Sequence, residues 1–457
     1  MLYALVDCDN CYVSCERVFN PGLEGKAVVV LSNNDGCVVA RSQEAKAIGI
    51  PEGLPFFQLS ERFPGQEIHA LSSNYTLYGD MSRRVMNILR AAAPDIFVYS
   101  IDEAFLMLDE SPYMPMDYKA WCEALAAKVR RWTGMPVSIG IARTKTLAKV
   151  ASKFAKRYPG FHKCCFIQTD EQREKALSLF PVADVWGIGR RHAARLLAAG
   201  VRTALDFTRL PAASVQRSMT VTGLRTWMEL HARDCIALDN LPRKQTICTS
   251  RSFPHMLSAL DALKVAVAGF AARCAQKLRQ QKSMAQMVTV FMSTNPFREE
   301  LDQLSLSRTV CLPAPAQSDA EIITAAHEAL ADCLEAARRR LSADYAELEY
   351  EPQTMGLRPA DHQWKRAGVI VGGIVPETEI QTSFLDIPPV LKQRLQQLSA
   401  VADRINARFG DEALQVAAAL RATDPATGKA LTFRNSILHD RRSPFYTTDI
   451  RDIIGVE

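Results

Sequence analysis

Three acidic residues near the start of the chain have the spacing of a cation site. Asp7 ends one apolar run, and Asp102 and Glu103 stand between the apolar runs 96–101 and 104–108. The runs are short and rich in β-branched and aromatic residues, which is typical of buried strands. A single Asp after a strand is more commonly a turn residue or a helix cap. Two such sites favour Mg²⁺, which prefers a few carboxylates with substrate phosphates, and so indicate phosphoryl transfer.

The bulk composition is that of an ordinary globular protein, with 48% hydrophobic and 23% charged residues in 457. A chain of this length is expected to form two to four domains. We find no secretion signal and no apolar run of about 18 residues, and therefore expect neither export nor membrane insertion. Cys8, Cys11 and Cys15 lack a second ligand pair for zinc, so reduced thiols in a cytoplasmic protein are expected.

Positive charge is concentrated in one part of the chain. Residues 186–310 contain 18 Lys and Arg and 8 Asp and Glu, a net charge of +10. The whole chain carries +5, so the remaining residues sum to −5. A solubilising surface would also carry charge, but this concentration favours binding to a nucleic-acid backbone.

The elements around the carboxylates are expected to alternate between strands and amphipathic helices. Turn signals at 33–36 join two of the strands as a hairpin. The expected strands are 27–32, 37–40 and 137–141, and the expected helices are 42–47, 75–90, 118–132 and 146–157. Mixed elements with antiparallel turns predict an α+β sheet domain rather than a doubly wound one.

The helix expected at 146–157 carries Lys149, Lys153 and Lys156 opposite its apolar face. These lysines form either a solvated surface or, because a core strand precedes the helix, a contact for a triphosphate. A second basic feature follows at Gly187-Ile188-Gly189, a pattern typical of a helix-hairpin-helix. Such a turn offers backbone N–H groups to a DNA phosphate, although any turn between helices can contain two glycines. The arginines that add charge there are Arg190, Arg191 and Arg195.

The second half of the chain predicts another small α+β domain after a polar linker. A helix at 260–280 is expected to point Arg273, Lys277 and Arg279 outward. A strand at 285–293 and a helix at 319–340 follow, and 341–364 has the acidic, aperiodic composition of an inserted loop. The remaining expected elements are a strand at 365–371 and a helix near 389–408.

Several strings resemble the palm motifs of Y-family translesion DNA polymerases. The strings are Leu5–Tyr12, Tyr99–Phe105 and Gly140–Lys156. Three others resemble the UmuC branch of that family, namely Leu31–Cys37, Ser73–Tyr75 and Val185–Arg191. The motifs occur in the family's order along nearly the whole chain.

The resemblance implies that Asp7, Asp102 and Glu103 are catalytic metal ligands, together with the backbone carbonyl of Cys8. Two Mg²⁺ ions would activate the primer 3′-hydroxyl and stabilise the departing pyrophosphate. Adjacent residues of a regular strand point to opposite faces, so Asp102 and Glu103 can share a site only where the pleat bends near a turn.

The nucleotide-binding residues are also implied by the resemblance. Tyr12 corresponds to the steric gate, an aromatic ring that clashes with a ribose 2′-hydroxyl. A packing tyrosine is the alternative. Lys156 corresponds to the palm lysine that contacts the triphosphate. Many relatives use Tyr and Arg from the fingers, whereas this chain has Gln43 and Lys46, and Arg41 is a candidate substitute for the arginine.

The resemblance implies a polymerase palm, fingers and helical thumb, an α+β little finger and a C-terminal extension. The implied boundaries are palm 1–14 and 74–166, fingers 15–73, thumb 167–237, linker 238–244, little finger 245–374 and tail 375–457. In the tail, Gln381, Phe384 and Leu385 lie where relatives have a sliding-clamp peptide, although the terminal pair is reversed.

The implied activity is error-prone DNA synthesis past damaged bases in the SOS response of a bacterial cytoplasm, associated with the nucleoid. The implied partners are primer-template DNA, deoxynucleoside triphosphates, the sliding clamp, a processed UmuD-type dimer and a RecA filament. Two other functions remain open. A nucleotide cyclase shares the sheet and carboxylates but needs no DNA-binding thumb, and a non-catalytic DNA scaffold has no need for three acids.

Overall fold

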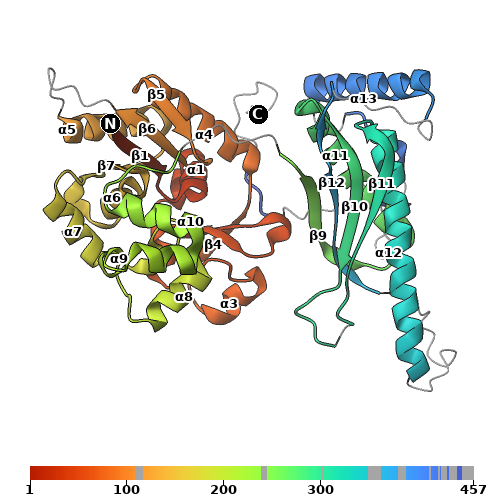
Figure 1. Cartoon of the computed structure of the whole chain (residues 1–457), viewed down its shortest axis with the longest axis horizontal. Coiled ribbons are helices and arrows are strands. Elements are labelled where there is room, and N and C mark those ends of the chain that lie inside the picture. Colours follow the sequence, from red (N-terminus) through yellow and green to blue (C-terminus); the bar gives the residue numbers. More distant parts are fainter. Residues whose placement is uncertain are drawn as a thin grey trace. The chain divides into compact units, whose positions relative to one another are not determined.

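The chain forms two compact units, which are shown in Figure 1 and described separately here. Unit 1 comprises Met1–Asn240 and His439–Glu457, and unit 2 comprises Leu241–Leu438. The computed structural model describes residues 1–108, 117–237, 244–300, 302–347, 362–378, 387–410, 413–419, 422–423, 430–431 and 440–444.

Unit 1 is built on a five-stranded sheet in the order β5-β6-β1-β7-β8. Its central strand pairs antiparallel with a neighbour on each side. The strands are β1 (Leu2–Cys8), β5 (Asp95–Val98), β6 (Glu103–Leu108), β7 (Val137–Ala142) and β8 (Cys164–Phe166). The predicted strands around Asp7, Asp102 and Glu103 are therefore confirmed, as is the mixed α+β class.

Helices cover both faces of this sheet because β1 is apolar on both sides. Leu2, Ala4 and Val6 pack against one helical layer, and Tyr3 and Leu5 pack against the other. The first layer comprises α1 (Cys11–Phe19), α4 (Tyr75–Arg90) and α5 (Tyr118–Thr133). The second layer begins with α6 (Lys145–Arg157). The bounds of α4 agree with the predicted helix, and Asn74 caps its first turn by accepting a hydrogen bond from the N–H of Leu77 at 3.3 Å.

A smaller three-stranded sheet lies between α1 and α4 in the sequence, in the order β3-β2-β4. The hairpin predicted at 33–36 joins β2 (Ala27–Leu31) to β3 (Val38–Arg41), and β4 (Ile68–Ser72) pairs parallel with β2 at the edge. The sheet has its own apolar core with the short helices α2 (Gln43–Ala47) and α3 (Leu59–Arg62).

The remainder of unit 1 is helical and packs onto the α6 side of the large sheet. Its helices are α7 (Asp170–Leu179), α8 (Arg190–Ala198), α9 (Ala204–Thr208) and α10 (Ala212–Leu230). Lys145 connects the large sheet to the segment that follows α10. Its ammonium pairs with Asp234 and lies 4.0 Å from the ring centre of Tyr3, which is on β1.

Unit 2 is a four-stranded antiparallel sheet, β11-β10-β12-β9, packed against two long helices. The strands are β9 (Ile247–Leu257), β10 (Ser283–Ser293), β11 (Ser305–Ala316) and β12 (Trp364–Gly372), and β13 (Val375–Pro376) pairs with β10. The helices are α11 (Leu260–Gln280), α12 (Asp319–Glu347) and α13 (Pro389–Phe409), followed by the short strands β14 (Ala422–Thr423) and β15 (Ala430–Leu431). None of the helices in the described residues is both long and apolar enough to cross a membrane.

One prediction for unit 2 is corrected at its ends and another is wrong. The region 341–364 was expected to be an inserted loop, but α12 continues to Glu347 and β12 begins at Trp364, and residues 348–361 lie outside the described residues. Arg279 was expected to face solvent, but its side chain is 10% exposed and pairs with Asp319 and Asp403 at 2.9 and 2.6 Å. The two carboxylates hold α12 and α13 against α11, a pairing between distant helices that local periodicity does not contain.

Candidate active site

The strand register brings Asp7 and Glu103 to the same face of the sheet. They are directly opposite each other in the antiparallel pair β1–β6, where facing side chains lie on one side. Asp102 lies outside β6, in the turn before it, and its backbone carbonyl accepts a hydrogen bond from the N–H of Cys8 at 2.8 Å. Strand β6 begins at Glu103, so Asp102 is outside the regular pleat that would point the two side chains to opposite faces. The turn that a shared site for Asp102 and Glu103 requires is therefore present.

Gly140 allows α6 to lie directly on the sheet beside these acids. A Cβ atom at Gly140 would lie 2.0 Å from the backbone nitrogen of Ser152 and 2.3 Å from the carbonyl oxygen of Ala148. Any larger residue would therefore push α6 away from β7. The close approach brings the lysines of α6 to Asp7 and Glu103, and together these residues border a cavity of about 330 Å³.

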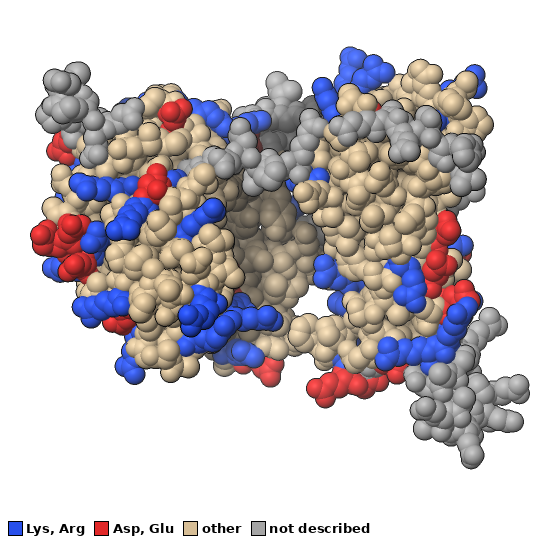
Figure 2. All heavy atoms as spheres, viewed as in Figure 1, with Lys and Arg blue, Asp and Glu red and all other residues tan. Residues whose placement is uncertain are grey.

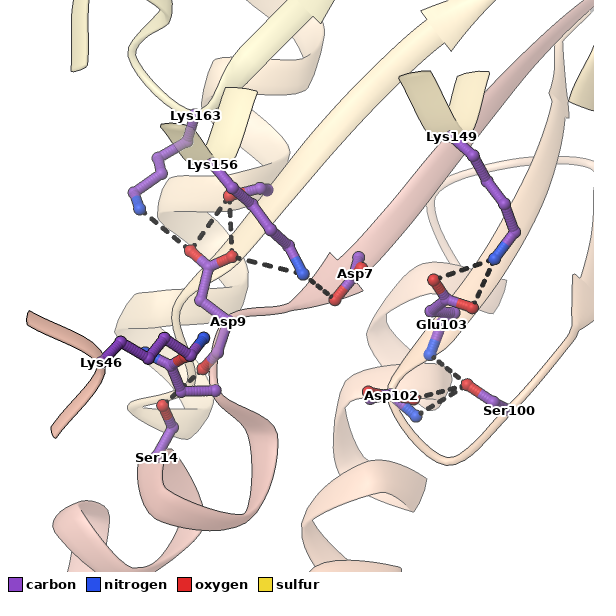
Figure 3. A network of polar contacts seen from close by, with 12 residues as sticks. Asp7, Asp9, Ser14, Lys46, Ser100, Asp102, Glu103, Lys149, Lys156 and Lys163 are labelled. Atoms are coloured by element: carbon purple, nitrogen blue, oxygen red, sulfur yellow. Dashed lines mark hydrogen bonds and ion pairs between the residues drawn. The ribbon is translucent and has the colours of Figure 1, made fainter. Parts of the chain in front are cut away.

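Two lysines of α6 neutralise the paired acids (Figure 3). Lys156 pairs with Asp7, and Lys149 contacts the two carboxylate oxygens of Glu103 at 2.8 and 3.0 Å. Burial raises the pKa of Asp7 to about 7 against the opposing effect of Lys156, and Glu103 and Asp102 raise it further. Burial alone would lower the pKa of Lys156. The negative charge of Asp7 and its hydrogen bond with Lys156 have the larger effect, so the pKa of Lys156 is raised. The site therefore concentrates negative charge that requires a cationic partner.

The carboxylates of Asp7, Asp102 and Glu103 have the chemistry that a hard cation prefers, but their oxygens do not converge on one point. Among the residues that the structure describes, no three His, Cys, Asp or Glu side chains converge as a metal site. Lysine ammonium groups instead provide the positive charge at Asp7 and Glu103. Among the described residues Asp102 forms no ion pair; it accepts a hydrogen bond from the hydroxyl of Ser100 at 2.5 Å. Carboxylate oxygens are the ligands that Mg²⁺ prefers.

Asp9 is a further acid of the site that sequence reasoning missed. It accepts hydrogen bonds from Lys163 at 2.9 Å and from the hydroxyl of Ser138 at 2.8 Å, and Lys156 lies 3.9 Å away. Lys156 therefore bridges Asp7 and Asp9 (Figure 3). The signal was available in the sequence, because Asp9 follows Asp7 by two residues at the end of the same strand.

Tyr12 lies in the first turn of α1 within an aromatic cluster. Its ring stacks on Tyr78 with the centroids 4.5 Å apart and meets the edge of Tyr75 at 5.9 Å. Burial, and then Tyr75, raise the pKa of Tyr12 to about 12, so the hydroxyl remains neutral at physiological pH. Tyr12 is half-buried, and one face of its ring is fixed by α4.

The predicted cations of the smaller sheet lie on the same side of unit 1 as Lys156. Lys46 donates a hydrogen bond to the amide oxygen of Asn10 at 2.6 Å. Loss of solvent lowers the pKa of Lys46, and the positive charges of Arg41 and Lys156 lower it further. Arg41 is held by the carbonyl of Ile50 at 2.8 Å and by Glu52 at 3.1 Å, so its guanidinium already has protein partners.

The glycine turn predicted to bind DNA precedes α8. Gly187 has a φ of 91°, and a Cβ there would lie 2.4 Å from the hydroxyl of Thr226, so glycine is required. Gly189 is the N-cap of α8, and no atom lies within 4 Å of where its Cβ would be. The segment before this turn ends in a single 3₁₀ turn at Val182–Asp184, not in an α-helix.

The three arginines of α8 are exposed on the surface of unit 1. Arg190 and Arg191 lie in the first turn of α8 and Arg195 lies one turn later. Figure 2 shows Lys and Arg gathered over the part of this unit where Figure 1 draws α8. A helix N-terminus with basic side chains attracts anions such as phosphate. The predicted clamp-binding residues Gln381, Phe384 and Leu385 lie outside the described residues.

Three family models match the chain in succession. The model of the impB/mucB/samB family matches residues 6–153, which include Asp7, Asp102 and Glu103. The model of that family's C-terminal domain matches residues 244–384, and a domain of unknown function (DUF4113) matches 396–456.

Individual relatives agree with these models. Protein UmuC of Salmonella typhimurium is 34% identical over the whole of both chains. Protein ImpB of the same species is 40% identical over 72% of this chain and 78% of the relative. A Y-family DNA polymerase chimera of Dbh and Dpo4 shares the fold, with a TM-score of 0.61 and 20% identity over 82% of this chain and all of the chimera. The chain belongs to the impB/mucB/samB family and is a UmuC-like Y-family DNA polymerase.

Proposed function

We propose that this chain catalyses template-directed, error-prone DNA synthesis past damaged bases as part of the SOS response. The observation that supports it most is the group of acids at the end of β1. Asp7 faces Glu103 in register, Asp102 occupies the adjoining turn, and lysines of α6 cover the pair. The names of the relatives, which include a DNA polymerase IV of Corynebacterium diphtheriae, point to the same chemistry.

In this proposal Asp7, Asp102, Glu103 and the carbonyl of Cys8 would hold two Mg²⁺ ions. Bound Mg²⁺ supplies Lewis-acid stabilisation of the transferred phosphoryl group and of the attacking and leaving oxygens. The chain's own lysines have a second task. Lys156 neutralises Asp7 in the present arrangement, and its ammonium would be free to contact the triphosphate if the carboxylate of Asp7 served as a metal ligand.

The remaining nucleotide contacts follow from the positions of the cations and of Tyr12. The positive charge of Lys156 lowers the pKa of Lys46, so the two ammonium groups lie within electrostatic range of each other and both would attract the triphosphate. Arg41 is a weaker candidate in geometric terms, because Ile50 and Glu52 already hold its guanidinium. Tyr12 would lie beneath the incoming sugar and exclude a 2′-hydroxyl by the bulk of its ring.

We assign the polymerase subdomains along the chain accordingly. The large sheet of unit 1 is the palm (1–14 and 74–166), the small sheet the fingers (15–73), and α7–α10 the thumb (167–237). Residues 238–244 link it to the little finger (245–374), and 375–457 form the partner-binding tail. The palm carries the acids and Tyr12, the fingers bring Lys46 to Asn10 beside them, and the thumb carries the arginines of α8.

The thumb is proposed to bind the DNA backbone through the N-terminus of α8. Replacing Arg190 and Arg191 by Ala should flatten the salt dependence of duplex binding, because each lost phosphate contact removes about 0.9 from the log–log slope. A titration of binding against salt concentration measures this, with an expected change of about 1.8 for the double variant. Arg130 and Arg131, an exposed adjacent pair at the end of α5, provide the matched control. An unchanged slope after the α8 substitutions would exclude them from DNA contact.

The proposed partners beyond DNA and deoxynucleoside triphosphates are the sliding clamp, a processed UmuD-type dimer and a RecA filament. The UmuD-type dimer is suggested by similarity to UmuC. The clamp is proposed from the sequence of Gln381, Phe384 and Leu385, which could enter a pocket on the clamp as an extended peptide. We place the protein in the bacterial cytoplasm at the nucleoid, where these partners act.

Primer extension with Mg²⁺ on undamaged and abasic templates tests the proposal. We expect nucleotide addition that requires the divalent cation, continues past the abasic site and increases when clamp, UmuD-type dimer and RecA filament are added. Replacing Phe384 and Leu385 by Ala should remove the clamp's stimulation and leave clamp-free extension unchanged. Cyclic nucleotide formation without extension would favour a cyclase, and DNA binding without either reaction would favour a scaffold.

A further inference from the structure

A short segment from the far end of the chain lies against the smaller sheet of unit 1. The backbone N–H of Ser72 donates a hydrogen bond to the carbonyl of Arg441 at 3.1 Å, and the N–H of Arg441 donates to the hydroxyl of Ser72 at 3.0 Å. Ser72 and Arg442 form a parallel β-bridge. Ser72 is the last residue of β4, an edge strand whose outer backbone groups are available for pairing. The segment Asp440–Pro444 therefore extends this sheet.

Two buried polar side chains face the same segment. Asn74, which is 1% exposed, donates to the hydroxyl of Ser443 at 3.0 Å and to the carbonyl of Pro444 at 3.4 Å. Glu16 is also 1% exposed, and the hydroxyl of Ser443 lies close enough to lower the pKa of its carboxyl group. A buried amide or carboxylate without a partner is costly, so these two groups form a receptor for a hydroxyl and a carbonyl of the segment.

A third contact involves the 3₁₀ turn Phe56–Gln58, which lies between α2 and α3. The guanidinium of Arg441 lies 4.9 Å from the ring centre of Phe56. Cation–π contacts of this kind favour arginine over a neutral side chain. The surface thus recognises three features of the segment, namely an extended backbone at Arg441 and Arg442, a cationic side chain and a serine hydroxyl.

The receptor is connected directly to the aromatic cluster around Tyr12. The hydroxyl of Tyr78 donates to Glu16 at 2.8 Å, and the ring of Tyr78 stacks on Tyr12 at 4.5 Å with an interplanar angle of 13°. Asn74 has two roles, since its amide oxygen also caps α4, the helix that carries Tyr78. A contact at Ser443 therefore reaches Tyr12 through Glu16 and Tyr78.

We propose that β4, Asn74 and Glu16 form a peptide-binding surface whose ligand is the chain's own Asp440–Pro444 segment, and that this segment fixes Tyr12 through Glu16 and Tyr78. The segment lies in the region matched by the domain of unknown function. In this proposal the C-terminal part of that domain binds to unit 1 of its own chain. Glu16 and Tyr78 are positioning residues in this arrangement, since they act on the incoming sugar through Tyr12. The second half of the proposal rests on the function proposed above for Tyr12.

Charge and backbone geometry favour this ligand over an unrelated peptide. Burial raises the pKa of Glu16, and the hydrogen bonds from Tyr78 and Ser443 offset this in part. The carboxylate thus needs hydroxyl donors at close range, and Ser443 provides one. The parallel bridge at Ser72 fixes the register in which Arg441 covers Phe56.

The test uses the full-length protein with Arg441 and Ser443 both replaced by Ala. Hydrogen exchange should become at least about tenfold faster at the amide of Ser72, because the segment detaches without these side chains and its carbonyl at position 441 no longer accepts from Ser72. Selectivity for deoxyribonucleotides over ribonucleotides, measured as a ratio of kcat/KM values on one template, should fall about tenfold. Asp440→Ala, an exposed change in the same segment, should alter neither quantity, and Ser443→Thr should preserve both because the hydroxyl remains.

The two readouts separate the parts of the proposal. Unchanged exchange at Ser72 in the double variant would overturn recognition of the segment through the side chains of Arg441 and Ser443. Faster exchange with unchanged sugar selectivity would overturn the connection to Tyr12. If the parent protein adds no nucleotides, the proposed polymerase function fails, whereas the exchange measurement still decides whether the segment binds.

Discussion

Replacing Asp102 by Asn should reduce nucleotide addition by about a thousandfold or more, because a bound metal contributes several kcal/mol to the transition state. The change removes one negative charge and keeps the shape of the side chain, including an oxygen that can accept the hydrogen bond from Ser100. Asp102 is the informative position, since Asp7 and Glu103 also pair with lysines and their replacement would break the ion pairs with Lys156 and Lys149 as well. Single-turnover primer extension at saturating nucleotide measures the effect.

Binding of primer-template DNA should remain within about twofold of the parent value, because the proposed phosphate contacts lie on α8. Asp95→Asn is the matched control, an exposed aspartate on β5 of the same sheet, and it should extend primers normally. Extension by the Asp102 variant at a tenth or more of the parent rate would show that this carboxylate does not hold a metal.

Elements with local signals at both ends were predictable from the sequence. The helix at 75–90 was correct because Asn74 caps it and its apolar residues repeat with helical period. The helix expected at 42–47 begins at Gln43, with Ser42 as the cap that accepts from the N–H of Ala45. The position of Asp102 in a turn also followed from the sequence, since only a break in the pleat lets it approach Glu103.

Pairings that depend on tertiary packing were not predictable in the same way. The lysines of α6 were recognised as one face, but periodicity could not show that Lys149 pairs with Glu103 and Lys156 with Asp7. Those pairs require the close approach of α6 to β7 at Gly140. The contact of Arg441 with Phe56 joins residues far apart in sequence and has no local signal at all.

Edge strands were missed for a different physical reason. β9 and β11 are the two edges of the unit 2 sheet, so they bury fewer apolar residues than β10 and β12 between them. β11 also contains Pro313 and Pro315, which normally argue against a strand but are tolerated at an edge. Local patterning therefore detects the centre of this sheet better than its borders.

Replacing Tyr12 by Ala should admit ribonucleotides, with selectivity against them falling by at least about a hundredfold. A ring that blocks a 2′-hydroxyl acts by volume, and a steric clash of a few kcal/mol corresponds to that factor. The ring is well placed to resist displacement, because Tyr78 stacks on it and Tyr75 meets its edge. Incorporation of matched ribo- and deoxyribonucleotides opposite one template base gives the ratio of kcat/KM values.

Tyr12→Phe separates ring bulk from the hydroxyl. This variant keeps the stacking surface, and the raised pKa of about 12 means that the parent tyrosine contributes no negative charge near the triphosphate. Phe should therefore exclude ribonucleotides nearly as well as Tyr. Loss of selectivity in the Phe variant would assign discrimination to a hydrogen bond of the hydroxyl, and unchanged selectivity in the Ala variant would leave Tyr12 as a packing residue of α1 and α4.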